Sequence, residues 1–413
     1  MRKRHLMRHQ RNHGGPTGRL GMSVLVFRRW FRITPLWMLV LALLAIPVAA
    51  QTPAPEETEP VEPPSFATWR VAKVDELEID GQAVAISPDG RWVAGIGPDG
   101  ESICAWRIST LRPTCAGESL RIQTLPLTGT ITWSPDSTAV AFIDGISQLY
   151  QPTDVMLFEV DSGILTNITL TGFMGRSYIH TGPAWTRDSE WVVFAETDPS
   201  GQRDQPASIV YYSREFMTSV PVPLEDAFYI TAPVVTMPDD SVLFRVEPSP
   251  EENAGIWRVD RNGENLQQVI AGEDDAPIDM PVVLGVSADG EHLSVASATA
   301  VARRDPSEAF FIVDVESGDV HDLELPDDGE VISQPVFDLD QLFALVQDGA
   351  GPGASLLIMN TDRDFQPLED GTLRESWLFH PPTWSRENTV LIPTDDGALL
   401  LTMVQDPEGP PFE

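Results

Sequence analysis

A short pattern recurs seven times along this chain at a nearly constant interval. Each copy has an apolar stretch, a tight turn that carries a carboxylate, and a second apolar stretch, as in the segment that begins at Ala83. The intervals between successive turn carboxylates are 47, 52, 51, 50, 51 and 47 residues. These carboxylates are Asp89, Asp136, Asp188, Asp239, Asp289, Asp340 and Glu387. A period of about 50 residues built from strands and turns is typical of a β-propeller.

Each repeat continues into a second hairpin, so that it supplies four strands, a to d, in chain order. The turns of these second hairpins contain combinations such as Asp-Ser-Gly and Arg-Asn-Gly, which favour hairpins. The seventh repeat has no fourth strand, whereas residues 69–79 alternate like a strand ahead of the first repeat. The sequence therefore predicts an all-β fold, a seven-bladed β-propeller of four-stranded antiparallel blades whose ring is closed by the N-terminal strand.

The turn motifs also carry a family resemblance. The segments Ser87–Gly90 (SPDG), Trp133–Asp136 (WSPD) and Trp185–Asp188 (WTRD) resemble the WD40-like (PD40) repeats of TolB-like propellers. The resemblance covers most of residues 83–403 and implies the architecture, with little about function. TolB-type proteins have six blades and an added α/β domain, whereas seven repeats are present here and residues 51–80 are too few for that domain.

The ends of the chain have different compositions from the repeats. Residues 1–35 carry nine basic residues and no acid, and an apolar run follows at residues 36–50, so residues 1–50 are predicted to be a signal peptide or membrane anchor. Residues 51–67 are a Pro/Glu-rich linker, residues 68–405 the propeller and residues 406–413 a C-terminal tail. We expect an extracytoplasmic protein, secreted or tethered by residues 36–50; signal cleavage and a start at Met1 or Met22 stay open.

The part after residue 50 is strongly acidic. It holds all 62 Asp and Glu against 18 Lys and Arg, a net charge of −44. This charge repels nucleic acid and anionic lipid, so we expect no nucleic-acid partner, membrane contact only through the N-terminal segment, and a monomer. The two cysteines, Cys104 and Cys115, flank a predicted hairpin turn and would lie opposite each other, which predicts a disulfide in an exported chain.

Chemical motifs point away from catalysis. A carboxylate in a Ser-Pro-Asp-Gly turn is expected to hydrogen-bond the local backbone, and the aromatic residues of strand a are expected to wedge between blades. These aromatic residues are Trp133, Trp185, Phe337 and Trp384. The chain has no G-x-S-x-G elbow and no His-x-x-x-His or Cys-x-x-Cys pair. We therefore assign no catalytic residue and expect neither a metal nor a cofactor.

The loops between strands b and c vary most in length, and in a propeller they share a face with the connections between blades. Aromatic, histidine and arginine residues in these segments are the ligand-binding candidates. They are Tyr178, His180, Tyr229, Trp377, His380, Arg203, Arg303 and Arg304. The favoured hypothesis is an exported non-catalytic binding or scaffold module for a protein, peptide or glycan at the cell surface. The alternatives are a glycan-active hydrolase or lyase of the envelope that uses acids and histidines at the channel mouth, and a purely structural envelope protein.

Overall fold

The structure is a computed structural model of the whole chain. It describes residues 68–122, 131–145, 153–169, 178–198, 207–224, 229–230, 232–246, 254–272, 278–303, 309–322, 329–331, 336–338, 341–348, 354–359, 363–367, 383–394 and 397–406. All of them belong to one compact unit, Glu62–Glu413. The predicted signal or anchor, the linker and nearly all of the C-terminal tail lie outside the described residues. No helix in the described ranges is long and apolar enough to cross a membrane.

Strand pairing groups the described strands into seven antiparallel sheets. The first contains β2 (Gln82–Ile86), β3 (Trp92–Ile96), β4 (Ile103–Arg107) and β5 (Arg112–Ala116). The second contains β6 (Thr132–Trp133), β7 (Ala139–Asp144), β8 (Asp154–Glu159) and β9 (Ile164–Asn167). The third contains β10 (Ile179–His180), β11 (Ala184–Trp185), β12 (Trp191–Thr197), β13 (Ser208–Ser213) and β14 (Thr218–Pro223). The fourth contains β15 (Val235–Thr236), β16 (Val242–Val246), β17 (Gly255–Val259) and β18 (Gln267–Ala271).

The remaining three sheets continue the pattern. The fifth contains β19 (Pro281–Val286), β20 (His292–Ser297), β21 (Phe310–Asp314) and β22 (Val320–Asp322), with the short helix α2 (Ala298–Arg303) after β20. The sixth contains β23 (Gly329–Val331), β24 (Val336–Asp338), β25 (Gln341–Asp348), β26 (Ala354–Met359) and β27 (Arg363–Pro367). The seventh contains β28 (Thr383–Ser385), β29 (Thr389–Thr394), β30 (Gly397–Asp406) and β1 (Thr68–Leu77).

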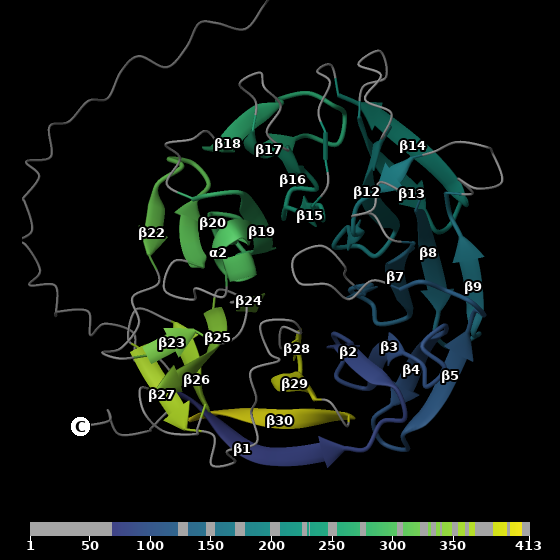
Figure 1. The fold of residues 1–413 in the computed structure, drawn as a ribbon, viewed down its shortest axis with the longest axis vertical. Helices are drawn as coiled ribbons and strands as arrows, with labels where there is room; N and C mark the ends of the chain where they lie inside the picture. The colour runs from purple at the N-terminus through teal and green to yellow at the C-terminus, as the bar shows by residue number, and fades with distance from the viewer. Residues whose placement is uncertain are drawn as a thin grey trace, which may run out of the picture. The chain divides into compact units, whose positions relative to one another are not determined.

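The sheets are arranged around a common centre, with the short strands innermost (Figure 1). Sheets that follow one another in the chain are in contact, and β2 of the first sheet also contacts β28 and β29 of the seventh. Within the seventh sheet, β1 pairs with β30 from Thr68 opposite Asp406 to Leu77 opposite Ala398. The fold is an all-β propeller, as the repeat predicted.

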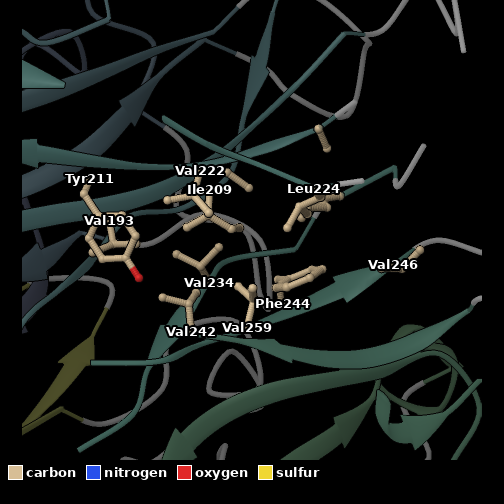
Figure 2. Packing of buried hydrophobic residues seen from close by; sticks show 13 residues of the cluster. Val193, Ile209, Tyr211, Val222, Leu224, Val234, Val242, Phe244, Val246 and Val259 are labelled. Carbon is tan, nitrogen blue, oxygen red and sulfur yellow. The ribbon is translucent and has the colours of Figure 1, made fainter. Parts of the chain in front are cut away.

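Apolar side chains from adjacent sheets form the core between them. Figure 2 shows one such cluster, in which Val193 and Ile209 of the third sheet pack with Phe244 of the fourth. Strand residues alternate between the two sides of a sheet, so each of the first four sheets contributes to two of the described clusters. For example, Phe244 belongs to this cluster, whereas its neighbour Leu243 packs in the cluster shared with the fifth sheet.

Two of the predicted wedge aromatics lie where the repeat pattern places them. The indole of Trp133 is 9% exposed and donates its Nε1 hydrogen to the carbonyl oxygen of Ala85 in the preceding sheet, at 3.1 Å. The indole of Trp185 likewise donates its Nε1 hydrogen to the carbonyl oxygen of Thr132, also at 3.1 Å. Both confirm the predicted packing between neighbouring sheets. Trp384 is half-buried, and the side chain of Phe337 lies outside the described part of the structure.

Candidate binding face

The propeller has two unlike faces, because antiparallel strands place their connections alternately at the two ends of each sheet. We call the end that carries the a–b turns and the c–d hairpin tips the a–b face. The end that carries the b–c connections and the segments entering strand a is the b–c face. The sequence pattern is most regular on the first face and most variable on the second.

The a–b turns repeat one hydrogen-bonding scheme. In the first turn, the Ser87 hydroxyl donates to Asp89 Oδ1 at 2.6 Å, and the same oxygen accepts the Arg91 backbone N–H at 3.1 Å. Asp136, Asp188 and Asp289 accept equivalent bonds in three other turns. In a fourth turn, Asp239 accepts both the hydroxyl and the backbone N–H of Ser241, which follows it by two residues. These contacts confirm that the turn carboxylates act on local structure, as expected for aspartate in such turns.

The turns are also bonded to one another around the a–b face. The Asp89 backbone N–H donates to Ser137 Oγ, and the Asp136 backbone N–H donates to Ser189 Oγ, each at 3.0 Å. The Arg386 backbone N–H donates to the carbonyl oxygen of Pro88 at 2.8 Å, which joins the last turn to the first. Neighbouring sheets are therefore held together by polar contacts at this face as well as by the apolar core.

The hydrogen bonds alter the acidity of several turn carboxyls. For Asp289, the hydrogen bonds from the Ser287 hydroxyl and the Glu291 backbone hold the pKa below its ordinary value. For Asp136, burial is the largest single influence and opposes ionisation. The bonds from Ser134 and Thr138, together with the charge of Arg214, outweigh it, so the pKa of Asp136 is also lowered. Both carboxyls are therefore stabilised as anions.

A pocket of about 460 Å³ opens on the b–c face, between the first and seventh sheets. Its walls come from the start of β2, the turn that follows β3, and the end of β29. The lining residues are Asp80, Gly81, Gln82, Ile96, Gly97, Pro98, Gly100, Pro393 and Thr394. Asp80 is exposed and is the ionisable group of this lining, while Gln82 and Thr394 add neutral polar groups. Such a pocket suits a ligand that donates hydrogen bonds.

Glycine at position 97 keeps the pocket wall thin. A Cβ atom there would lie 2.3 Å from Ser102 Oγ and 2.8 Å from Cys104 Sγ, closer than packing allows. Cys104 is itself bonded to Cys115 on the next strand, with 4.1 Å between their Cα atoms. The two cysteines are direct partners in the β4–β5 register, which confirms the predicted disulfide. The disulfide therefore fixes the strand that lies directly behind the pocket wall.

His180 lies on the b–c side of the third sheet but does not present its ring to solvent. Its side chain is fully buried, and its ring packs edge-on against Phe194 at 5.6 Å between centroids. Nδ1 is 2.6 Å from the carbonyl oxygen of Thr153, and since a carbonyl only accepts, Nδ1 donates. Nε2 lies 3.4 Å from Glu196 Oε2. The ring of His180 is thus buried and bridges the second and third sheets.

The reason for this burial is pairing that the sequence does not reveal. His180 is the register partner of Glu196 at the end of β12, so the segment entering strand a is drawn onto the sheet. Tyr178 and Tyr229 are half-buried at the entries to the third and fourth sheets. Trp377, His380, Arg203 and Arg304 lie outside the described residues, as does the side chain of Arg303 at the end of α2. Ligand binding by these eight residues stays a prediction.

The sequence reasoning missed the pocket residues Asp80, Gln82 and Thr394. Thr394 is more than 300 residues away from Asp80 and Gln82 in the chain, and they come together only because the first sheet contacts the seventh. The glycines at 81, 97 and 100 were the available signal, since three glycines near one b–c turn indicate close backbone approach. Within the described ranges, no group of three or more His, Cys, Asp or Glu side chains is placed to hold a metal ion.

Comparison with known proteins supports the fold only. No family model and no curated protein sequence matches the chain. Among solved structures, it is similar to an oligogalacturonate lyase in complex with manganese, with a TM-score of 0.50 and 12% identity over 82% of this chain and 98% of that one. It is also similar to the β-propeller domain of the Trilobed protease from Pyrococcus furiosus, with a TM-score of 0.45 and 10% identity over 80% of this chain and 99% of that one. TolB from Acinetobacter baumannii gives a TM-score of 0.39 and 12% identity over 79% of both chains.

Proposed function

We propose that this protein is an exported, non-catalytic binding or scaffold propeller that acts through its b–c face. The observation that carries the proposal is the contrast between its faces. The a–b turns bind one another through their own hydroxyls, carboxylates and amides, whereas a pocket of about 460 Å³ opens on the b–c face. A rigid ring loses little ordering entropy when a ligand binds to such a face.

The proposal includes a ring of seven blades that is closed by β1. The support is that the described strands form seven sheets, that β2 contacts β28, and that β1 completes a fourth strand beside β30. We assign the repeats to the WD40-like (PD40) class of TolB-like propellers because of their Ser-Pro-Asp turns. In this arrangement the pocket lies at the seam where the ring closes, between the first and last blades.

The proposed location is outside the cytoplasm, secreted or tethered through residues 36–50. The Cys104–Cys115 disulfide supports an oxidising compartment, as does the basic and apolar N-terminal sequence. The proposed partners are a protein, a peptide or a glycan, bound by a monomer without a cofactor. Asp80 favours ligands that offer hydroxyl or N–H donors, and the acidic surface argues against nucleic acid.

The experiment compares two matched double variants of the chain on peptide and glycan arrays. Asp80→Ala with Gln82→Ala changes the pocket, and Glu316→Ala with Asp319→Ala changes two exposed acids at a c–d tip of the a–b face. We expect array ligands of the unmodified chain to be lost by the pocket variant and kept by the control. Ligands retained by both variants would contradict binding at this pocket, and ligands lost by both would contradict the choice of face.

The second candidate is a glycan lyase or hydrolase of the envelope. It is favoured by the contact of His180 with Glu196 and by the likeness of the fold to an oligogalacturonate lyase. It ranks lower because the His180 side chain has no exposed surface from which to reach a substrate. Release of shorter or unsaturated oligosaccharides from polygalacturonate by the purified chain, abolished by His180→Gln, would reverse this ranking.

A further inference from the structure

The hairpin tip between β13 and β14 differs from its counterparts in the other sheets. The position four residues beyond the last residue of strand c takes a left-handed backbone in five of the described sheets. It is occupied by Leu111, Gly163, Met217, Gly263 and Gly318, with φ values of 53°, 68°, 48°, 83° and 73°. A left-handed backbone favours glycine, because a Cβ atom crowds the chain there. Met217 therefore occupies a position whose backbone favours a different residue.

Packing accounts for Leu111 but not for Met217. Leu111 is partly buried and packs against the core between the first and seventh sheets. Met217 is 76% exposed, and its neighbour Phe216 is 67% exposed. The residues that correspond to Phe216 in the other tips are Thr110, Ser162, Asn262 and Ser317, all exposed and polar. Two large apolar side chains are thus exposed at a tip where the hairpins of the second, fourth and fifth sheets have a polar residue followed by glycine.

Arg214 anchors this tip firmly to the second sheet. Its Nη2 donates to Glu159 Oε2 at 2.7 Å and to Thr138 Oγ1 at 3.0 Å, and its Nη1 lies 3.3 Å from Asp136 Oδ2. The guanidinium also lies over the ring of Trp185, at 5.4 Å from the ring centroid. Because these contacts fix the tip, the backbone that carries Phe216 and Met217 loses little conformational entropy when a partner binds.

The tip that Arg214 binds also carries an exposed apolar residue. Ile164, the first residue of β9, is 57% exposed and is the register partner of Glu159, which Arg214 binds. We call Ile164, Phe216 and Met217 the apolar patch. It lies on the a–b face, so it is separate from the pocket and independent of the function proposed for the b–c face.

Acidic side chains accompany the apolar patch. Asp161 and Glu215 are exposed within the two tips themselves. Glu190 is exposed as well, and its carbonyl oxygen accepts the Arg214 backbone N–H at 3.0 Å. A second copy of this chain would bring like charges together, since its net charge is −35. A basic partner would instead find opposite charge around an apolar centre.

We propose that the apolar patch is a docking site for a protein partner whose contacting segment combines aromatic or aliphatic side chains with lysine or arginine. Phe216 and Met217 supply the apolar anchors, and the surrounding carboxylates select a cationic segment. In this proposal, methionine occupies a backbone position that favours glycine because its side chain contacts the partner.

The test is a selection of displayed random peptides against the unmodified chain, followed by affinity measurements on a double variant. Phe216→Ser with Met217→Gly converts the tip to the Ser-Gly found at 162–163 and 317–318. We expect the thermal unfolding midpoint to stay the same or rise, because glycine relieves the left-handed backbone. The selected peptides should be cationic with aromatic or aliphatic residues, and should bind the double variant at least about tenfold more weakly.

Two controls separate docking from general effects. Val74→Ser removes an apolar side chain that is 47% exposed on β1, and should leave peptide affinity unchanged. Leu111→Gly should lower the unfolding midpoint, since Leu111 packs on a core, and also leave affinity unchanged. The proposal is overturned if no peptide distinguishes the double variant, or if the discriminating peptides are neutral or acidic. It is also overturned if sedimentation shows that the unmodified chain self-associates through Phe216 and Met217.

Discussion

The two faces of this propeller carry similar polar residues that have different roles. On the a–b face, hydroxyls and carboxylates of successive turns bond to one another, as when Asp136 N–H donates to Ser189. On the b–c face, polar groups such as Asp80 line a pocket and His180 is withdrawn into the sheet. The difference teaches that the regular part of a repeat protein stabilises the ring, whereas departures from regularity are where binding can be accommodated.

Among substitutions that test this comparison, Trp133→Ala is expected to have the largest effect on stability. The substitution removes a buried indole and its hydrogen bond to Ala85 beside the a–b turns, so it should lower the free energy of unfolding by about 3–5 kcal/mol. Denaturant unfolding measures the loss, with the exposed Phe216→Ser as a control that should change little. A loss of unfolding free energy as small as that of the control would mean that the core between these sheets does not depend on the Trp133 indole.

The next effect concerns the covalent support of the b–c face. Replacing Cys104 and Cys115 together by serine opens a loop of 11 residues and should destabilise the chain by about 2–3 kcal/mol. Reductant should destabilise the unmodified chain by a similar amount and leave the variant unaffected. A reductant effect on the variant would show that the measured change does not arise from this disulfide.

A smaller effect tests the contact between turns on the a–b face. Ser189→Ala removes the hydroxyl that accepts the Asp136 N–H, and should cost about 1 kcal/mol in the free energy of unfolding. Ser189→Gly removes the same hydroxyl but relieves a left-handed backbone with φ of 64°, so it should cost less. If the glycine variant were the less stable of the two, the backbone argument for this position would be wrong.

The smallest effect is a dependence on pH. Hydrogen bonds lower the pKa of the Asp289 carboxyl in the folded chain, so its stabilising contribution is present above the ordinary pKa of about 4. That contribution is lost as the pH falls through the lower folded value. The unfolding midpoint should therefore fall on acidification below pH of about 4, and less steeply in Asp289→Asn. Parallel curves for the two chains would contradict a lowered pKa at Asp289.

Much of the fold could be predicted because its signals are local. Turn residues and alternating apolar positions repeat at short range, so the strands, the role of Asp89 and the pairing of Cys104 with Cys115 followed from the sequence. The same pattern predicted the position of Trp133, since four of the seven repeats place an aromatic residue just before the turn. Local chemistry was sufficient for these features.

The candidate surfaces were much less predictable. Nothing local to His180 signals that Thr153 and Glu196 enclose its ring, because those contacts come from another sheet and from the far end of a strand. Met217 looked like an ordinary apolar residue of a hairpin until its backbone and exposure were known. Exposure depends on what the neighbouring sheet covers, which no residue's own sequence context specifies.

By itself, then, the sequence determined the repeat, the β-structure, the chemistry of the turns and the acidic character of the chain. These follow from short-range periodicity and composition, which survive in any arrangement of the repeats. Only the tertiary structure decided which polar groups line a pocket between β2 and β29, and which apolar side chains stay exposed at the tip after β13. Those outcomes depend on contacts between segments far apart in the chain, and such contacts exist only once the sheets have packed together.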